Sequence, residues 1–412
     1  MAAQPGAEHL PSALAIYGIA AGAHAVSAAL VIAGVVEDPG FYPVGRQAPI
    51  AAQIAGQVLL QVAYGLCFWL ARATRRTSIR AIAALQQATR LAAQRDVQLA
   101  ELRRDLDRAI EVGMPGRFTD HTVGAWQLGN VLGRGAMGEV YEARHATTGE
   151  EAAVKLLRRE LIADPRHIER FIREVRVASA LDSPYVVRVL EAATPSDGLP
   201  FLAMERLRGK TLGELLRSGN TLTGIDLAEM LAQVGRAFET ARAAGIVHRD
   251  VKPHNLFRGD DGRWKVLDFG VAALADGSST LTHGGVIGTP AYMSPEQARG
   301  EPVDHRADVY ALGAVIYRCL TGRVPFVAGD TPSLLYAVVH DMPLRPSAIA
   351  RIDDDLERVL MLALAKTRDA RLASAAELVA AFDAATTSSL PDELVRRARA
   401  LARRHPWSEP PA

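Results

Sequence analysis

The stretch "IVHRDVKPHN", Ile246–Asn255, gathers unlike polar side chains into one short run. Asp250 supplies a carboxylate, which can accept a proton from a hydroxyl group. Lys252 supplies a cation that can neutralise negative charge, and Asn255 supplies an amide oxygen of the kind that binds hard cations. A run of solvated surface charges is the alternative interpretation, and the surrounding sequence decides between the two.

A second group of residues could bind phosphate. Gly133, Gly135 and Gly138 in "GRGAMGEV" have the spacing G-x-G-x-x-G. Dinucleotide-binding folds use the same spacing, but there the glycines open a helix. Here Val140 and Tyr141 continue an alternating strand pattern, which predicts a glycine hairpin between two strands. Because glycine has no Cβ, backbone N–H groups in such a hairpin can approach phosphate oxygens.

Lys155 follows in the next predicted strand, "AAVKLL". A lysine among apolar neighbours has to direct its ammonium group toward an anion, because an unpaired buried charge is costly. A lysine on an exposed edge strand is the alternative. The next segment, from about 165 to 181, predicts a helix with an apolar stripe. Glu174 lies beside that stripe and can pair with Lys155.

The region from Trp126 to about Ala385 resembles a eukaryotic-type (Hanks-type) protein kinase of the bacterial Ser/Thr class. The motifs that carry the resemblance, in chain order, are "GRGAMGEV", "AVK", Glu174, "HRDVKPHN", "DFG" at 268–270, "GTPAYMSPE" at 288–296 and "DVYALG" at 308–313. The resemblance implies an α+β bilobal protein kinase fold. A small β-rich N-lobe would cover about 126–207 and a larger helical C-lobe about 208–385.

The resemblance assigns a role to each polar residue of the opening stretch. Asp250 would accept the proton of a substrate hydroxyl and orient its oxygen. Lys252 would neutralise charge on the transferred phosphoryl group, and family resemblance ties it to Ser/Thr substrates. Asn255 and Asp268 would hold magnesium, which manganese could replace.

The resemblance also outlines an ATP pocket. Met204 looks like the gatekeeper, and 205–207 like the hinge whose backbone binds the purine edge. Lys155 would hold the α- and β-phosphates while paired with Glu174. Arg206 departs from the apolar or aromatic residue common at its position, and no part in the chemistry is expected of it. The nucleotide-binding residues implied are Leu132, Gly133, Arg134, Gly135, Ala136, Met137, Gly138, Glu139, Val140, Ala153, Lys155, Met204, Glu205 and Leu207.

Regulation is expected at the activation loop, residues 271–287. Kinases with an arginine at the position of Arg249 often bind a phosphorylated activation loop through it. Thr280 and Thr282 are the expected autophosphorylation sites, chosen by position alone. Thr289 resembles the residue that hydrogen-bonds the catalytic aspartate and lysine in Ser/Thr kinases.

Four further residues of the motifs look structural. Glu296 would form a buried salt bridge with Arg371 in the C-lobe, and Asp308 would hold the backbone of the catalytic loop. His248 is expected to support that loop, not to act as an acid or base. Buried charges such as these need partners.

Two apolar segments precede the kinase-like region, at 12–36 and 48–71, after a short tail at 1–11. Neither segment contains a fixed charge, and each exceeds the roughly 20 residues that a membrane-spanning helix needs. Four arginines follow the second segment, whereas the loop between the two has only Arg46. The positive-inside rule therefore predicts a two-span hairpin in the cell membrane with the kinase domain in the cytoplasm. A buried helical hairpin of a soluble domain is the alternative.

The sequence predicts helices in the segments before and after the kinase-like region. Residues 72–117 form a juxtamembrane segment, in which 78–112 predicts one long helix that could form a coiled coil or stay solvated. A homodimer that phosphorylates in trans would follow from such a coil. The tail at 386–412 contains a basic amphipathic pattern, "PDELVRRARALARRHPW". It could touch anionic lipid or the kinase surface, and a solvated terminal helix is the expected state.

Composition narrows the function classes. The net charge of +1 does not indicate the basic surface that nucleic-acid-binding proteins have. The two distant cysteines provide neither a disulfide framework nor a zinc site. Two hypotheses remain: an active kinase using ATP and magnesium on protein Ser/Thr hydroxyls, or a pseudokinase scaffold. The marks of an active enzyme, Lys155, Asp250, Asn255 and Asp268, are all present, so the active enzyme is predicted.

Overall fold

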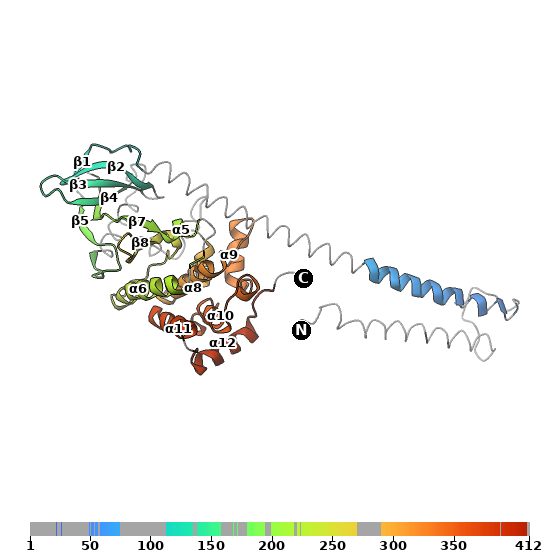
Figure 1. Ribbon diagram of the computed structural model, residues 1–412. Coiled ribbons are helices and arrows are strands. Elements are labelled where there is room, and N and C mark those ends of the chain that lie inside the picture. Colours follow the sequence, from blue (N-terminus) through green and yellow to red (C-terminus); the bar gives the residue numbers. More distant parts are fainter. Residues whose placement is uncertain are drawn as a thin grey trace. The chain divides into compact units, whose positions relative to one another are not determined.

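The computed structural model divides the chain into two compact units, Met1–Ala88 and Thr89–Ala412 (Figure 1). The structure describes residues 22, 26, 49, 51–52, 54–56, 58–74, 113–134, 138–157, 168, 171, 179–193, 199–217, 221–222, 224–269, 290–387 and 389–409.

The first unit contains a predominantly apolar helix, Ile54–Thr74, of 21 residues. Its length and composition suffice to cross a membrane, and its apolar side chains, among them Leu59 and Trp69, are exposed. This helix corresponds to the second predicted span. Of the first predicted span only Gly22 and Val26 are described, both helical. The rest of that span, and the helix predicted at 78–112, lie outside the described residues.

The second unit begins with a six-stranded antiparallel sheet in the order β1-β2-β3-β4-β6-β5. Its strands are β1 (Thr122–Val123), β2 (Trp126–Arg134), β3 (Gly138–His145), β4 (Glu151–Leu157), β5 (Val189–Ala193) and β6 (Phe201–Glu205). The three strands predicted around the glycine hairpin and Lys155 correspond to β2, β3 and β4.

Alternation along the strands separates two faces of this sheet. Tyr141, Val154 and Ala203 are buried in a core on one face. Because neighbouring residues of a strand point to opposite faces, Val140 and Lys155, which pair across β3 and β4, lie on the other face. The sheet thereby presents Lys155 away from its own core.

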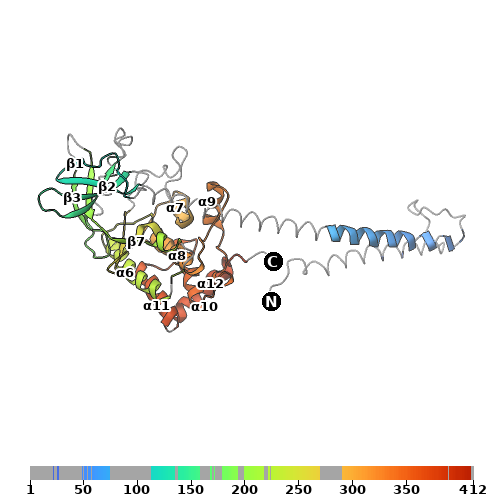
Figure 2. The same ribbon diagram turned by 45° about the horizontal axis from the view of Figure 1, so that its top comes forward.

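The helical part of the second unit (Figure 2) also contains a small sheet of β7 (Gly209–Thr211), β8 (Leu256–Gly259) and β9 (Trp264–Val266). Its α-helices are α5 (Leu212–Leu215), α6 (Gly224–Ala243), α7 (Pro295–Ala298), α8 (Arg306–Thr321), α9 (Thr331–His340), α10 (Asp354–Ala363), α11 (Ala375–Thr387) and α12 (Asp392–Arg404). Short 3-10 turns lie at Pro253–Asn255, Pro290–Tyr292, Pro346–Ala348 and Arg368–Ala370.

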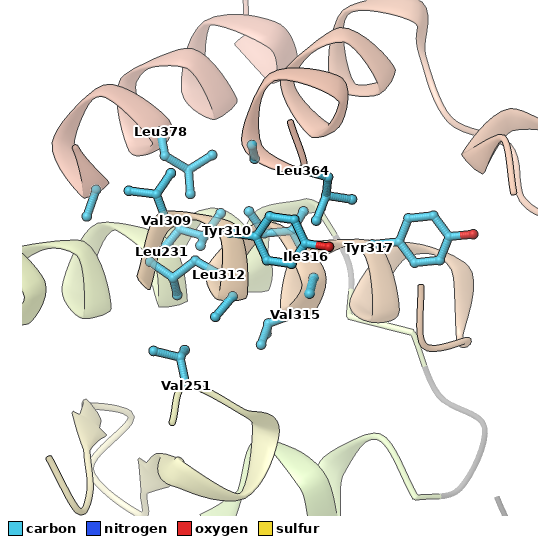
Figure 3. Packing of buried hydrophobic residues seen from close by; sticks show 14 of the residues in the cluster. Leu231, Val251, Val309, Tyr310, Leu312, Val315, Ile316, Tyr317, Leu364 and Leu378 are labelled. Atoms are coloured by element: carbon cyan, nitrogen blue, oxygen red, sulfur yellow. The ribbon is translucent and has the colours of Figure 1, made fainter. Parts of the chain in front are cut away.

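Helix α8 forms the centre of this core. It is buried almost all round, as its continuous apolar sequence requires, and Tyr310 and Ile316 pack there beside Leu231 of α6 and Leu378 of α11 (Figure 3). A Cβ on Gly313 would lie 2.7 Å from the Cβ of Ala363, so the glycine permits the close approach of α8 to α10.

The C-terminal helix differs from the expectation. Leu394, Ala398 and Leu401 of α12 are buried in the same core, and Trp407 beyond the helix is 6% exposed. Ser408 continues into a backbone bridge, in which its N–H donates to Pro343 O at 3.0 Å. The expectation of a solvated terminal helix is therefore wrong. The apolar residues are spaced i, i+4 and i+7, which forms one stripe that needs a partner surface.

Candidate functional site

The loop that contains Asp250 is fixed by Asp308, in the first turn of α8. The two carboxylate oxygens of Asp308 accept hydrogen bonds from the backbone N–H groups of His248 and Arg249, each at 2.9 Å. Arg249 has a left-handed backbone with a φ of 67°, so the chain turns sharply just before Asp250. Burial raises the pKa of Asp308, and these two donors partly offset that effect.

His248 joins this loop to the segment before Asp268. Its Nε2 lies 3.0 Å from Leu267 O, and its Nδ1 accepts from the N–H of Asp250 at 3.2 Å. A proton on Nε2 satisfies both contacts, so neither ring nitrogen is left for proton transfer. The ring also lies 4.7 Å from that of Phe269. These contacts support the structural role that the sequence suggested.

Asp250, Lys252 and Asn255 come together at one point. Lys252 Nζ donates to Asp250 Oδ2 at 2.7 Å. Asn255 Nδ2 donates to the backbone oxygen of Asp250 at 2.8 Å and to its Oδ2 at 3.2 Å. With its amide nitrogen used in this way, Asn255 has an amide oxygen that accepts no hydrogen bond from the described residues and is of the kind that binds a cation. The arrangement holds a carboxylate, an ammonium group and an amide oxygen around one small volume.

Lys155 connects β4 to this centre. Its Nζ lies 3.2 Å from Asp268 Oδ1, and the Coulomb attraction between them lowers the pKa of Asp268. Asp268 is therefore an anion at neutral pH, as a metal ligand must be. Its φ of 45° directs the chain away from the strand that precedes it. Glu174, the partner predicted for Lys155, lies outside the described residues.

The glycine hairpin is described at its two ends. Arg134 pairs with Glu139 across β2 and β3, with Nε and Oε1 2.9 Å apart. A Cβ on Gly138 would lie 2.1 Å from Leu156 O, so only glycine fits at this crossing. Leu132 and Gly133 lie just before Arg134, the last residue of β2. The predicted nucleotide-binding residues Gly135, Ala136 and Met137 lie outside the described residues.

The sheet register shows where three residues of the predicted ATP pocket lie. Ala153 pairs with Met204, so Val140, Ala153 and Met204 share the face that carries Lys155. Glu205 and Leu207 begin the segment that runs from β6 to β7, between the two sheets. Their part in nucleotide binding remains a prediction.

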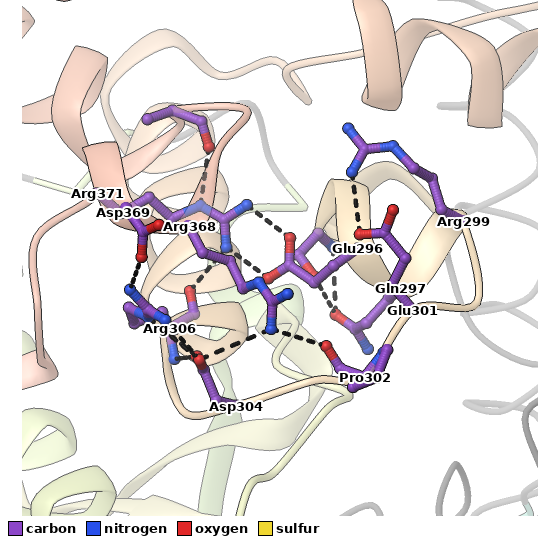
Figure 4. A network of polar contacts seen from close by, with 12 residues as sticks. Glu296, Gln297, Arg299, Glu301, Pro302, Asp304, Arg306, Arg368, Asp369 and Arg371 are labelled. Carbon is purple, nitrogen blue, oxygen red and sulfur yellow. Dashed lines mark hydrogen bonds and ion pairs between the residues drawn. The ribbon is translucent and has the colours of Figure 1, made fainter.

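A buried network braces the C-lobe behind the catalytic loop (Figure 4). Arg371 donates to both oxygens of Glu296, each at 2.6 Å, and both side chains are at most 1% exposed. Burial alone would raise the pKa of Glu296, but the hydrogen bonds and charge of Arg371 outweigh it and lower the pKa. The expected Glu296–Arg371 pair is thus present.

Gln297 makes a contact with the catalytic loop that the sequence did not predict. Its Nε2 donates to the backbone oxygen of Arg249 at 2.8 Å, which links α7 to the catalytic loop. Gln297 also forms a capping box with Ser294. The pattern S-x-x-Q at 294–297 was the available signal. The expected regulatory residues Thr280, Thr282 and Thr289 lie outside the described part of the chain.

Comparison with known proteins agrees with this geometry. The family model described as the protein kinase domain matches residues 126–380. The chain belongs to the protein kinase family. The resemblance to Hanks-type bacterial kinases and the bilobal fold are therefore confirmed.

Several bacterial kinases are similar to this one. The Ser/Thr protein kinase PknB of Mycolicibacterium smegmatis is 42% identical over 265 residues, which cover 63% of this chain and 42% of PknB. A probable Ser/Thr protein kinase of Streptomyces coelicolor is 42% identical over 262 residues, covering 62% of this chain and 39% of its own length. The crystal structure of the PknI kinase domain of Mycobacterium tuberculosis has a TM-score of 0.53 at 27% identity, covering 64% of this chain and 98% of that domain.

The chain spans less than half the length of the curated relatives that it matches. The similarity is thus between kinase domains. It gives no information on the segments before and after the kinase domain of this chain.

Proposed function

We propose that this kinase transfers the γ-phosphate of ATP to Ser or Thr hydroxyls of proteins. The observation that carries the proposal is the contact between Lys252 Nζ and Asp250 Oδ2 at 2.7 Å, with Asn255 hydrogen-bonded to the same carboxylate. Positioning and charge neutralisation supply most of the catalysis in phosphoryl transfer, and this group provides both. The relatives at 42% identity, named Ser/Thr kinases, support the choice of acceptor.

Each residue has a definite task in this proposal. Asp250 orients the acceptor hydroxyl and takes its proton, while Lys252 places a positive charge beside the group in transfer. Lys155 binds the nucleotide phosphates on the face of the sheet that also carries Val140 and Ala153. Asn255 and Asp268 would hold a divalent cation, whose charge offsets that of the phosphates. Two oxygen ligands suit magnesium, which keeps waters and binds phosphates, and manganese could replace it.

Membrane attachment and loop phosphorylation complete the proposal. The helix Ile54–Thr74 supports one span, and the apolar sequence at 12–36 supports a second. By its resemblance to other kinases, Arg249 is proposed to bind a phosphate on the activation loop, and Thr280 and Thr282 are the proposed acceptors. Trans-phosphorylation within a homodimer would place that phosphate.

The test uses the full chain in detergent micelles with ATP and magnesium, and maps phosphosites by mass spectrometry. Wild type should label Ser and Thr residues of itself and of a generic basic protein. Lys155→Met and Asp250→Asn should label neither, and an exposed substitution, Lys210→Met, should label both.

Binding of a fluorescent ADP analogue is measured beside it. Wild-type protein that binds nucleotide but transfers no phosphate would refute the kinase activity and leave an ATP-binding scaffold. Label on Ser and Thr that persists in Asp250→Asn would refute the role given to Asp250.

A further inference from the structure

Arg206 in the hinge segment forms an ion pair that neither the family match nor the sequence assigned. Its Nη1 lies 2.6 Å from Oε2 of Glu142 on β3. The other oxygen of Glu142 accepts from the backbone N–H of Asn130 at 3.2 Å. The hydrogen bond from Arg206 is the largest influence on Glu142 and lowers its pKa, so the carboxylate stays ionised.

The pair of Arg206 and Glu142 lies beside residues of the predicted nucleotide pocket. In the sheet, β4 lies between β3 and β6, and Ala153 of β4 pairs with Glu142 on one side and Met204 on the other. Adjacent strands are about 4.8 Å apart, so a link from the end of β6 to β3 has to span about 10 Å. The pair therefore bridges β4 beside Ala153, on the face that also carries Val140 and Lys155.

The same short segment is tied to the C-lobe as well. Glu205 Oε1 accepts from Lys265 Nζ on β9 at 2.6 Å and from the backbone N–H of Arg188 at 2.7 Å. Glu205 and Arg206 are neighbours in sequence. The side chain of Arg206 binds β3 of the N-lobe, whereas that of Glu205 connects the N-lobe to Lys265 of the C-lobe. The hinge is thus held from both sides at the point where the two lobes meet.

A third pair in the segment provides an internal comparison. Arg208 Nη2 lies 2.9 Å from Glu151 Oε2, but its side chain is 69% exposed, against 25% for Arg206. Exposed ion pairs are weakened by solvent screening and contribute little, whereas half-buried ones keep more of their strength.

We propose that Arg206, held by Glu142, is a positioning residue that fixes the hinge against the roof of the nucleotide pocket and thereby strengthens nucleotide binding. This inference rests on the proposed function only for the identity of the ligand, an adenine nucleotide. Without the pair, the hinge backbone and Ala153 would vary in separation, and part of the nucleotide's binding energy would go into ordering them.

The experiment measures binding of a fluorescent ADP analogue with magnesium to the full chain in detergent micelles. ADP avoids turnover, so the result does not depend on phosphate transfer. The variants are Arg206→Met, Glu142→Gln, the two together, and the exchanged pair Arg206→Glu with Glu142→Arg. Arg208→Met is the matched control, because it makes the same substitution two residues away in an exposed pair.

Each single variant should weaken binding about five-fold, a change expected from one half-buried ion pair. The double variant should be no weaker than either single one, and Arg208→Met should stay within about two-fold of wild type. The exchanged pair should recover part of the affinity, because the ion pair is restored while an arginine cannot accept from the N–H of Asn130. In kinetics KM for ATP should rise while kcat holds, because Asp250 and Lys252 are untouched.

Additive effects of the two single variants would overturn the inference, since they would show that the residues act independently. Unchanged affinity in Arg206→Met, or an equal loss in Arg208→Met, would overturn it as well. Failure of phosphate transfer by wild type would instead count against the proposed function alone.

Discussion

At the scale of single residues, Lys366 shows how the C-lobe accommodates a buried cation. Its Nζ donates to Val338 O at 2.6 Å and lies 4.3 Å from the centre of the Phe326 ring. Val338 is in the last turns of α9, where the negative end of the helix dipole and free carbonyls attract a cation. Burial nevertheless lowers the pKa of Lys366 to about 7.

Lys366→Met should therefore change how stability depends on pH. Between pH 7 and 9 folded Lys366 has lost its proton while the unfolded side chain keeps one, so the free energy of unfolding of wild type rises with pH. Relative to the variant, wild type should gain about 2 kcal/mol over this interval, at up to about 1.4 kcal/mol per pH unit. Chemical denaturation of the full chain in detergent at both pH values measures the gain. A constant difference between variant and wild type would contradict it, and Lys210→Met, at an exposed lysine, is the control.

The residues that could be predicted from sequence are those whose partners are close in the chain or belong to the family's motifs. Asp250, Lys252 and Asn255 lie within six positions, and their meeting follows from one loop. The pairing of Arg206 with Glu142 joins residues 64 positions apart and depends on strand order and register. No local sequence pattern encodes such a contact. The contact of the Lys366 ammonium group with the Phe326 ring likewise joins residues that are distant in sequence.

At the scale of elements, α12 packs against the C-lobe and forms part of its core. Arg397 donates to the backbone oxygen of Arg371 at 2.7 Å and pairs with Glu377 of α11 at 3.0 Å. The helix therefore contacts the residue whose side chain holds Glu296. Its amphipathic pattern predicted a helix correctly, but a pattern of this kind does not name the surface that covers it.

Trp407→Ala should destabilise the C-lobe. Removing a buried tryptophan side chain typically costs about 3–5 kcal/mol, because both apolar burial and close packing are lost. Arg399→Ala, at an exposed position of α12, should change the unfolding free energy by no more than about 0.5 kcal/mol. Urea denaturation followed by circular dichroism separates the two. Equal stability of the two variants would show that the C-terminal segment does not belong to the core.

At the scale of the whole molecule, the chain combines a kinase with an exposed apolar helix. Leu59, Val62 and Leu66 of that helix are each more than half exposed, which is unfavourable in water. A bilayer removes this surface from water. The sequence predicted two spans from length and absence of charge, and the described residues contain one helix that meets those criteria.

The full chain should remain with membranes after extraction at high salt and at alkaline pH, which release proteins bound only to the surface. A chain lacking residues 1–74 should appear in the soluble fraction. Retention of the shortened chain would place the attachment in the kinase itself, and release of the full chain would contradict membrane insertion.

The burial of Trp407 in the C-lobe core also has a consequence for synthesis. A chain folds from its N-terminus as it is made, so the N-lobe sheet can close once Glu205 has emerged. The C-lobe core then waits for α12, and until that helix arrives the apolar sides of its neighbours are open to water. The interval between these two events is when the nascent chain most needs protection from aggregation.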